Sequence, residues 1–375
     1  MQASQNNNNI LMADSAWADL PKEILNLISK RVENELNLVH FRSVCSSWRS
    51  SSIPIPPTIL FKFPLISYSD RPELLSDIIN GRHSTPFCYL SKRCFLLIKP
   101  PEQPQTMQRP WLIQITTNTR GKIKLSHPII TYHSSSPFVC LPPVLDFNKF
   151  PVVQLGSDFV VNNQHSHFVG PEKVVALSRH GEKPVVLGIM RNVYFREVIF
   201  RCRDEQWKVI EDIARHGDIC VFKGRFYAVD RTGRTVRVEV EHDDDGVELV
   251  DNPLIVGDRK LLVESNGELL LVNIYDYLWF SVVVFKLDEK GKKWVKLKSL
   301  GDRVLFLGSG YSFAASASDL RVAKGNCVVF MDDTFLSFQN RQQGKCVYHL
   351  DRYELLSDYE EYFNLFSPPE WLVRS

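Results

Sequence analysis

The sequence lacks several features that would define a chemistry or a compartment. Its eight cysteines are scattered and form no CxxC pair, which disfavours both a disulfide framework and a zinc site. No stretch approaches the ~20 apolar residues of a membrane span. The N-terminal stretch MQASQNNNNILMADSAW has neither the basic segment nor the apolar run of a signal peptide. We therefore expect a nuclear or cytoplasmic protein with no membrane partner.

Charge and catalytic motifs are equally uninformative. The 45 basic and 43 acidic residues leave a formal net charge of +2, so the balance gives no reason to expect a nucleic-acid partner. No GxSxG, HExxH or kinase motif occurs, and the GSG at 308–310 lacks the third glycine of a dinucleotide fingerprint. His165 and His167 would share a strand face, but no further ligand stands near them. We expect no catalytic residue, no cofactor and no metal.

The composition changes along the chain and predicts separate domains. With 375 residues, the chain is too long for one ordinary core, unless that core is a repeat array or a barrel. The Pro/Ser cluster SSIPIPP at 51–57 cannot continue a helix. We predict a disordered leader at 1–12, a helical module at 13–51, a linker at 52–57 and a β-rich domain at 58–375.

Short β-branched and aromatic runs separated by turn residues fill the second region. Asn266-Gly267 predicts a hairpin, and Thr232-Gly233 predicts another with less specificity. A strand headed by tryptophan or valine recurs at Trp207, Val247 and Trp294, at spacings of 40 and 47 residues. Each interval has room for four short strands, which is typical of a β-propeller blade. The fold class we expect is mostly β, a propeller of about six or seven blades after a small α-helical module; residues 71–80 resemble an insertion or an irregular blade.

Two helical segments make up the first module. Pro21 suits the first turn of LPKEILNLISKR at 20–31. The apolar residues that share one face of this segment are Leu20, Ile24, Leu25 and Ile28. A second helical stretch is predicted to carry Leu38, Phe41, Val44, Cys45 and Trp48. The last four recur at i, i+3, i+4 and i+7, which predicts a single apolar stripe.

This stripe has two interpretations. Amphipathic helices usually pack on their own protein, so the module could be an N-terminal cap on the β domain. However, a linker separates it from that domain, and ~40 residues are too few for an independent core. The simplest completion of such a module is a partner protein.

The pattern LPxEILxxISxR…LxxFRSVCxSWRS at 18–50 closely resembles the F-box of plant F-box proteins. The resemblance implies docking on a Skp-type adaptor and, through it, on the cullin scaffold of an SCF ubiquitin ligase. By that resemblance, the residues that form or support the interface are Leu20, Pro21, Ile24, Leu25, Ile28, Leu38, Phe41, Val44 and Trp48.

The β-rich region resembles the KIB-type β-propeller of plant F-box proteins. The segments that carry this likeness include WKVIED at 207–212, KGNCVVFMDD at 324–333 and PPEWL at 368–372. The resemblance implies a non-catalytic substrate receptor whose propeller binds an unknown target protein for ubiquitination. Candidate target-binding loops are 162–172, 242–247 and 339–345. Two alternatives stay open: a propeller enzyme or small-molecule binder with a helical cap, and an adaptor-binding protein without ubiquitin transfer.

Overall fold

The computed structural model divides the chain into two compact units. One comprises residues 1–59 with 117–122, and the other comprises 60–116 with 123–375. The residues that the structure describes are 19–32, 35–52, 62–64, 66–67, 87–101, 108–117, 123–126, 128, 149–162, 168–169, 173–177, 185–191, 197–203, 206–210, 216–239, 246–276, 280–308, 311–330, 346–352, 354–355 and 360–373. The predicted leader, most of the linker and the segment 71–80 lie outside them.

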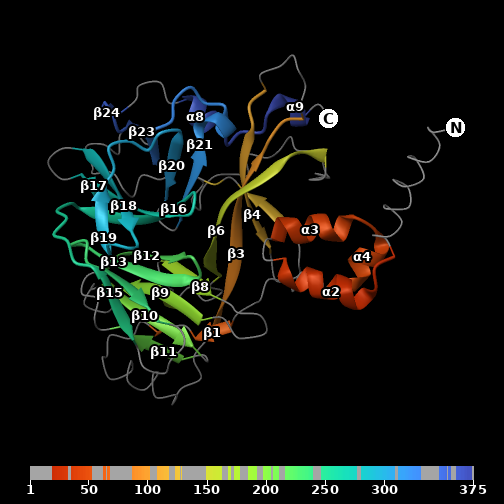
Figure 1. Ribbon diagram of the computed structural model, residues 1–375, viewed down its shortest axis with the longest axis horizontal. Helices are drawn as coiled ribbons and strands as arrows, with labels where there is room; N and C mark the ends of the chain where they lie inside the picture. Colours follow the sequence, from red (N-terminus) through yellow and green to blue (C-terminus); the bar gives the residue numbers. More distant parts are fainter. Residues whose placement is uncertain are drawn as a thin grey trace. The chain divides into compact units, whose positions relative to one another are not determined.

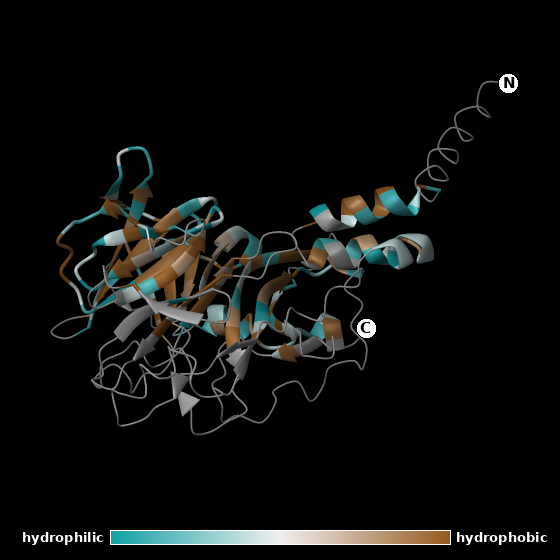
Figure 2. Cartoon of the chain, turned by 90° about the horizontal axis from the view of Figure 1, so that it is seen from below, coloured by the Kyte–Doolittle hydropathy of each residue, from teal (hydrophilic) through white to brown (hydrophobic). Residues whose placement is uncertain are grey.

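The described part of the first unit contains the helices α2 (Lys22–Arg31), α3 (Glu35–Ser43) and α4 (Ser46–Ser51), drawn in red and orange in Figure 1. Both α2 and α3 pack against α4. The Leu25 N–H donates to the Pro21 carbonyl at 3.1 Å, so the helix begins one residue after the proline. Hydrophobic and hydrophilic residues alternate along these helices (Figure 2). No helix in the described ranges has the length and hydrophobicity needed to cross a bilayer.

The predicted single helical stripe after residue 34 is wrong. Cys45 is extended, with φ −159° and ψ 174°, and it separates α3 from α4. Its Sγ accepts a hydrogen bond from the Trp48 N–H at 3.5 Å, which caps α4. Cys45 is apolar, so the apolar residues kept a helical spacing across the break. The sequence pattern therefore did not reveal that Cys45 caps a second helix. The Phe41 and Trp48 rings still meet across the break, with centroids 4.5 Å apart.

Three successive groups of four antiparallel strands follow the chain order in the second unit (Figure 1). The first is β8 (Lys173–Leu177), β9 (Val185–Arg191), β10 (Glu197–Arg203) and β11 (Gln206–Val209). The second is β12 (His216–Phe222), β13 (Arg225–Asp230), β14 (Thr235–Val238) and β15 (Val247–Asp251). The third is β16 (Arg259–Ser265), β17 (Glu268–Tyr275), β18 (Ser281–Asp288) and β19 (Lys293–Lys296).

The remaining strands flank these groups at both ends of the unit. The early strands are β1 (Lys62–Pro64), β2 (Ile66–Ser67), β3 (Phe87–Ile98), β4 (Trp111–Thr117), β5 (Ile123–Ser126), β6 (Val152–Asn162) and β7 (Phe168–Val169). They join the first group in a nine-stranded sheet of order β11-β10-β9-β8-β6-β3-β4-β5, with β1 beside β3, while β2 and β7 pair separately. The late strands are β20 (Arg303–Leu307), β21 (Ser312–Ser316), β22 (Cys327–Phe330), β23 (Cys346–His349) and β24 (Glu354–Leu355), in the order β21-β20-β22-β23-β24.

The predicted repeat corresponds to equivalent positions in the sheets. Trp207, Val247 and Trp294 lie in β11, β15 and β19, which are the fourth strands of the three groups. Asn266 and Gly267 have φ angles of 53° and 72°, so they form the predicted hairpin turn between β16 and β17. Gly233, with φ 98°, lies in the predicted turn between β13 and β14.

The described strands do not confirm the count of six or seven blades. Five of them, β6, β8, β12, β16 and β21, contact one another in succession, and β21 also contacts β6. Each pair of neighbouring sheets shares an apolar cluster, as in the group of Leu270 and Val272 with Val328 and Phe330. The inner strands of the second unit therefore form a closed ring of contacts with apolar cores between the sheets.

Short helices also occur among the described residues of the second unit: α6 (Ala317–Leu320), α8 (Glu360–Asn364) and α9 (Glu370–Val373). The Leu112 N–H of β4 donates to the Leu365 carbonyl at 2.8 Å, and the Trp371 indole donates to the Arg109 carbonyl at 2.9 Å. Tyr362 and Phe366 share a core cluster with residues of β3, β20 and β22. The C-terminal segment thus joins the first strands of the unit to its last sheet.

Candidate protein-interaction site

The residues predicted to bind an adaptor fall into groups by their exposure. Leu25 and Phe41 are buried. Ile24 is 42% exposed and Val44 is 59% exposed, and Pro21, three residues before Ile24, is also exposed. Leu20, Ile28 and Trp48 are half-buried, and the Leu38 side chain lies outside the described part. The predicted set therefore mixes side chains that form a core with side chains that face solvent.

Polar contacts fix the positions of the three helices. The Asn26 side-chain amide of α2 donates to the Ser51 carbonyl at the end of α4, at 3.3 Å. Arg42 of α3 donates to the Ser52 hydroxyl at 2.7 Å, and Arg49 Nε donates to the Arg42 carbonyl at 3.1 Å. The two arginines of the FRSVCSSWR motif therefore tie α3 to α4. The sequence pattern gives no sign of this role, because the bonds depend on the break at Cys45.

Leu27 was also missed. It is 54% exposed on α2, three residues after Ile24, whereas Leu25 and Ser29 of the same helix are buried. The sequence pattern placed the centre of the apolar face between Ile24 and Leu25. Only the packed structure shows which edge of that face turns inward.

A chain of polar contacts crosses the inner strands of the second unit. Arg93 of β3 pairs with Asp158 of β6, with Nε 2.8 Å from Oδ1. Burial raises the pKa of Asp158, although Arg93 acts in the opposite direction. Lys173 of β8 pairs with Asp218 of β12 at 2.6 Å. The second oxygen of Asp218 accepts the Leu262 N–H of β16 at 2.8 Å, so one carboxylate connects three sheets.

The side chains of Arg93, Asp158, Lys173 and Asp218 bond to one another or to backbone groups. Few of their hydrogen-bonding atoms are therefore available to a ligand. Lys260 of β16 is an exception: it is 1% exposed, and its ammonium has no hydrogen-bond partner among the described residues. Burial lowers the pKa of Lys260 to about 8, with Asp230 and Asp258 acting in the opposite direction. No group of three or more His, Cys, Asp or Glu side chains in the described ranges could hold a metal ion.

Two large apolar side chains project from the connection between β15 and β16. Leu254 is 83% exposed and Val256 is 68% exposed. Their backbone is nevertheless fixed: the Ile255 N–H donates to the Thr232 carbonyl at 2.8 Å, and Asn273 Nδ2 donates to the Val256 carbonyl at 2.9 Å. We call Leu254 and Val256 the apolar ridge. Rigid, exposed apolar side chains of this kind are typical of interaction surfaces.

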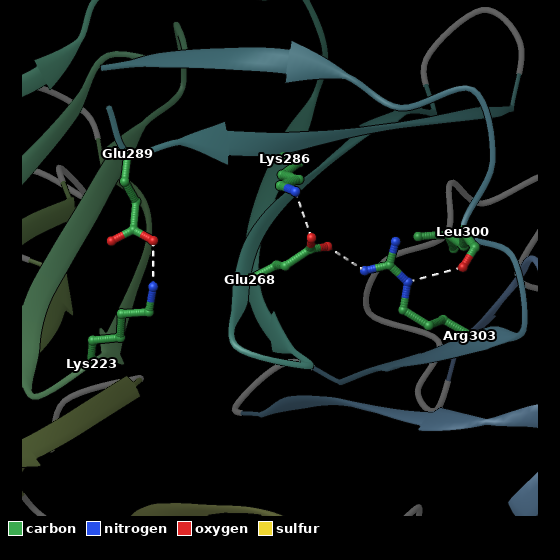
Figure 3. A network of polar contacts seen from close by, with 6 residues as sticks. All are labelled: Lys223, Glu268, Lys286, Glu289, Leu300 and Arg303. Carbon is green, nitrogen blue, oxygen red and sulfur yellow. Dashed lines mark hydrogen bonds and ion pairs between the residues drawn. The ribbon is translucent and has the colours of Figure 1, made fainter. Parts of the chain in front are cut away.

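The strand ends near the β16–β17 and β18–β19 hairpins carry charged side chains. Glu268 binds both Lys286, at 2.5 Å, and Arg303, at 2.8 Å (Figure 3). Lys223 pairs with Glu289 at 2.5 Å in the same view. These charges are engaged within the chain. The apolar ridge is therefore the better candidate for a contact with another molecule.

The predicted target-binding loops are not tested by the structure. The loop 339–345 and most of 162–172 and 242–247 lie outside the described residues, as do His165 and His167.

Comparisons with known proteins identify the family of the chain. The sequence profile of the KIB1-4 β-propeller family matches residues 87–349. F-box protein SKIP23 of Arabidopsis thaliana is 34% identical over 401 residues, covering 95% of this chain and 95% of that protein. F-box protein At2g17036 of Arabidopsis thaliana is 32% identical over 398 residues, covering 96% and 95%. A solved complex of fission yeast SREBP–SCAP binding domains aligns with a TM-score of only 0.24 at 9% identity, over 62% of this chain and 68% of that one, and supports no conclusion.

The residue range of the profile, the extent of the matches and the strand groups define a β-propeller protein preceded by short helices. The chain belongs to the plant F-box proteins that carry a KIB1-4 β-propeller.

Proposed function

We propose that this chain is the substrate-recognition subunit of an SCF ubiquitin ligase. The helices α2 to α4 would bind a Skp-type adaptor and, through it, a cullin scaffold. The propeller would bind a target protein and hold it for ubiquitination. The family supports this proposal, since the relatives that match nearly the whole chain are named F-box proteins.

One observation carries the adaptor proposal. Ile24 and Val44 remain exposed on a helical module whose own core is supplied by Leu25 and Phe41. Burying such exposed apolar side chains against another surface lowers the free energy, because it removes them from water. In this proposal Pro21, Ile24 and Val44 contact the adaptor, with Leu20, Ile28 and Trp48 at the border. Leu25 and Phe41 act by holding the helices together.

Target binding is assigned to the propeller. The apolar ridge supports this assignment, because exposed apolar anchors on a rigid backbone bind at a low entropic cost. This chain would contribute no catalytic side chain. Its effect would be proximity, since holding the ubiquitin-charged enzyme and the target lysine on one assembly makes their encounter effectively intramolecular.

The adaptor proposal is tested by co-purification. The full chain is co-expressed with a recombinant Skp-type adaptor, and a Leu20→Ala/Pro21→Ala variant is compared with the wild type. We expect a stoichiometric complex for the wild type and its loss for the variant, at unchanged helix content by circular dichroism. A complex that survives the double substitution would remove Leu20 and Pro21 from the interface, and a wild-type chain that binds no adaptor would refute the proposed function.

A further inference from the structure

A run of lysines occupies the turn after β18, the strand β19 and the residues that follow it. The segment 290–298 reads KGKKWVKLK, and all five of its lysines are exposed. Lys292 pairs with Glu248 of β15 at 2.9 Å. The other four side chains make no ion pair and no hydrogen bond with the described residues, and we call them the lysine cluster: Lys290, Lys293, Lys296 and Lys298.

The carboxylates around this segment are bound to other groups. Asp288 accepts two backbone N–H groups of the turn, at 3.2 and 3.1 Å. Glu289 is bound by Lys223 at 2.5 Å (Figure 3), and Glu248 is bound by Lys292. The lysine cluster therefore carries positive charge that the described part of the chain does not neutralise.

A cavity of about 710 Å³ adjoins the lysine cluster. It is lined by residues 286–290 and by Val295 and Leu297, so Lys290 belongs both to the lining and to the cluster. Val295 is 43% exposed, and Leu297 is half-buried. The site therefore presents apolar surface inside a cavity directly beside several cations.

Lysines on an outer strand can have a purely protective role, because they discourage pairing with a strand of another molecule. That role would suit the two lysines within β19, but not Lys290 and Lys298, which lie outside the strand. The edge of β19 is also partly closed within the chain, since the Trp294 N–H donates to Asp251 of β15 at 2.7 Å. Protection of the edge therefore does not account for the whole cluster.

We infer that the lysine cluster and this cavity form a docking site for an acidic segment of the target protein, with carboxylates at the lysines and one apolar side chain in the cavity. This inference rests on the proposed function, and it adds a charged contact to the apolar one that the ridge provides. The chemistry disfavours single-stranded nucleic acid, because Trp294 is buried and no exposed aromatic side chain in 290–298 could stack on a base. It disfavours a membrane, because the apolar side chains line a cavity.

Fluorescence anisotropy of the purified full chain with labelled synthetic peptides tests the site. The probe is a peptide of glutamates around one leucine, and the reference peptide has alanine in place of the leucine. We expect saturable binding of the leucine peptide that weakens as salt is added. Lys290→Glu/Lys298→Glu and, independently, Lys293→Gln/Lys296→Gln should each weaken it roughly tenfold at an unchanged melting temperature.

Two further variants separate the site from general charge attraction. Lys22→Glu/Lys324→Glu changes the net charge as much as the first double variant, at exposed lysines elsewhere, and should bind like the wild type. Val295→Ser should remove the preference for the leucine peptide over the alanine peptide. Equal binding of the two peptides by the wild type, or equal losses in the control variant, would overturn the inference.

The remaining outcomes distinguish this inference from the proposed function. A wild-type chain that binds the adaptor but not the leucine peptide refutes the docking site alone. A wild-type chain that binds the peptide but no adaptor refutes the proposed function and leaves the docking site. Tighter binding of a DNA duplex, or of vesicles containing phosphatidylserine, that the same lysine variants abolish would assign the cluster to a different partner and overturn the inference.

Discussion

At the scale of single residues, several interactions of this protein could not be predicted from sequence patterns. Lys173 and Asp218 are 45 positions apart, and nothing in the intervening sequence indicates that they pair. Leu25 and Leu27 are both leucines of one amphipathic helix, yet one is buried and the other is exposed. Hydrophobic periodicity indicates that a face is covered, but the side chains at its edge are assigned only by packing.

Asp218→Asn should destabilise the propeller unit by about 3 kcal/mol, because it leaves the Lys173 ammonium without its counter-charge in a site that is largely buried. An asparagine also cannot accept through both side-chain atoms, so either the Ile219 or the Leu262 N–H loses its acceptor. Urea unfolding measures the difference. Lys292→Ala removes an exposed ion pair with Glu248 and serves as the control, with an expected change below about 0.5 kcal/mol. Equal losses of unfolding free energy for Asp218→Asn and Lys292→Ala would contradict the prediction that the buried ion pair stabilises the unit more than the exposed one.

Lys260→Met should stabilise the same unit at pH 7, by roughly 1–3 kcal/mol, because it removes a buried ammonium without a hydrogen-bond partner among the described residues. Burial outweighs the attraction of Asp230 and Asp258, since the pKa of Lys260 falls to about 8. An unfolded lysine has a pKa of about 10.4, so between these two values the unfolded chain binds more protons. Wild-type stability therefore rises with pH in that window.

The advantage of Lys260→Met should accordingly be largest at pH 8 and below and should shrink toward about pH 10. Urea unfolding of both chains across this range is the measurement. A variant that is less stable than the wild type at pH 7 would show that Lys260 is compensated by its acidic neighbours.

At the scale of elements, the sequence predicted hairpin turns but missed helix boundaries. The Asn266-Gly267 hairpin is determined by two adjacent residues with positive φ, and it was predicted from them. The break between α3 and α4 was not predicted, because Cys45 is compatible with both an apolar stripe and a cap. The C-terminal helices α8 and α9 were not expected either, since PPEWL stood out only through its family resemblance.

The C-terminal helices α8 and α9 should stabilise the packing of β4. Leu372 is fully buried in a cluster with Trp111 and Ile113, so Leu372→Ala should cost about 2–5 kcal/mol. Thermal unfolding followed by tryptophan fluorescence measures the loss, and Ser367→Ala, at an exposed position of the same segment, is the control. An unchanged melting temperature for Leu372→Ala would mean that the C-terminal segment does not stabilise the second unit.

At the scale of the whole molecule, the repeat was the informative signal. The four successive groups of strands that follow residue 172 begin at Lys173, His216, Arg259 and Arg303, at intervals of 43, 43 and 44 residues. This lies within the period of 40 to 50 residues that the sequence suggested, and the family profile covers the same region. The blade count and the predicted boundaries at 13–51 and 58–375 stay predictions, because segments of 53–86 and 118–148 lie outside the described residues.

The central claim is that the helices bind an adaptor while the propeller is a separate folded body that recognises the target. Its most direct test is one comparison of the full chain with residues 57–375, by thermal unfolding and by size-exclusion chromatography with a Skp-type adaptor. We predict that the shortened chain melts cooperatively near the temperature of the full chain's propeller and no longer co-elutes with the adaptor. A shortened chain that unfolds, or one that still binds the adaptor, would contradict the account.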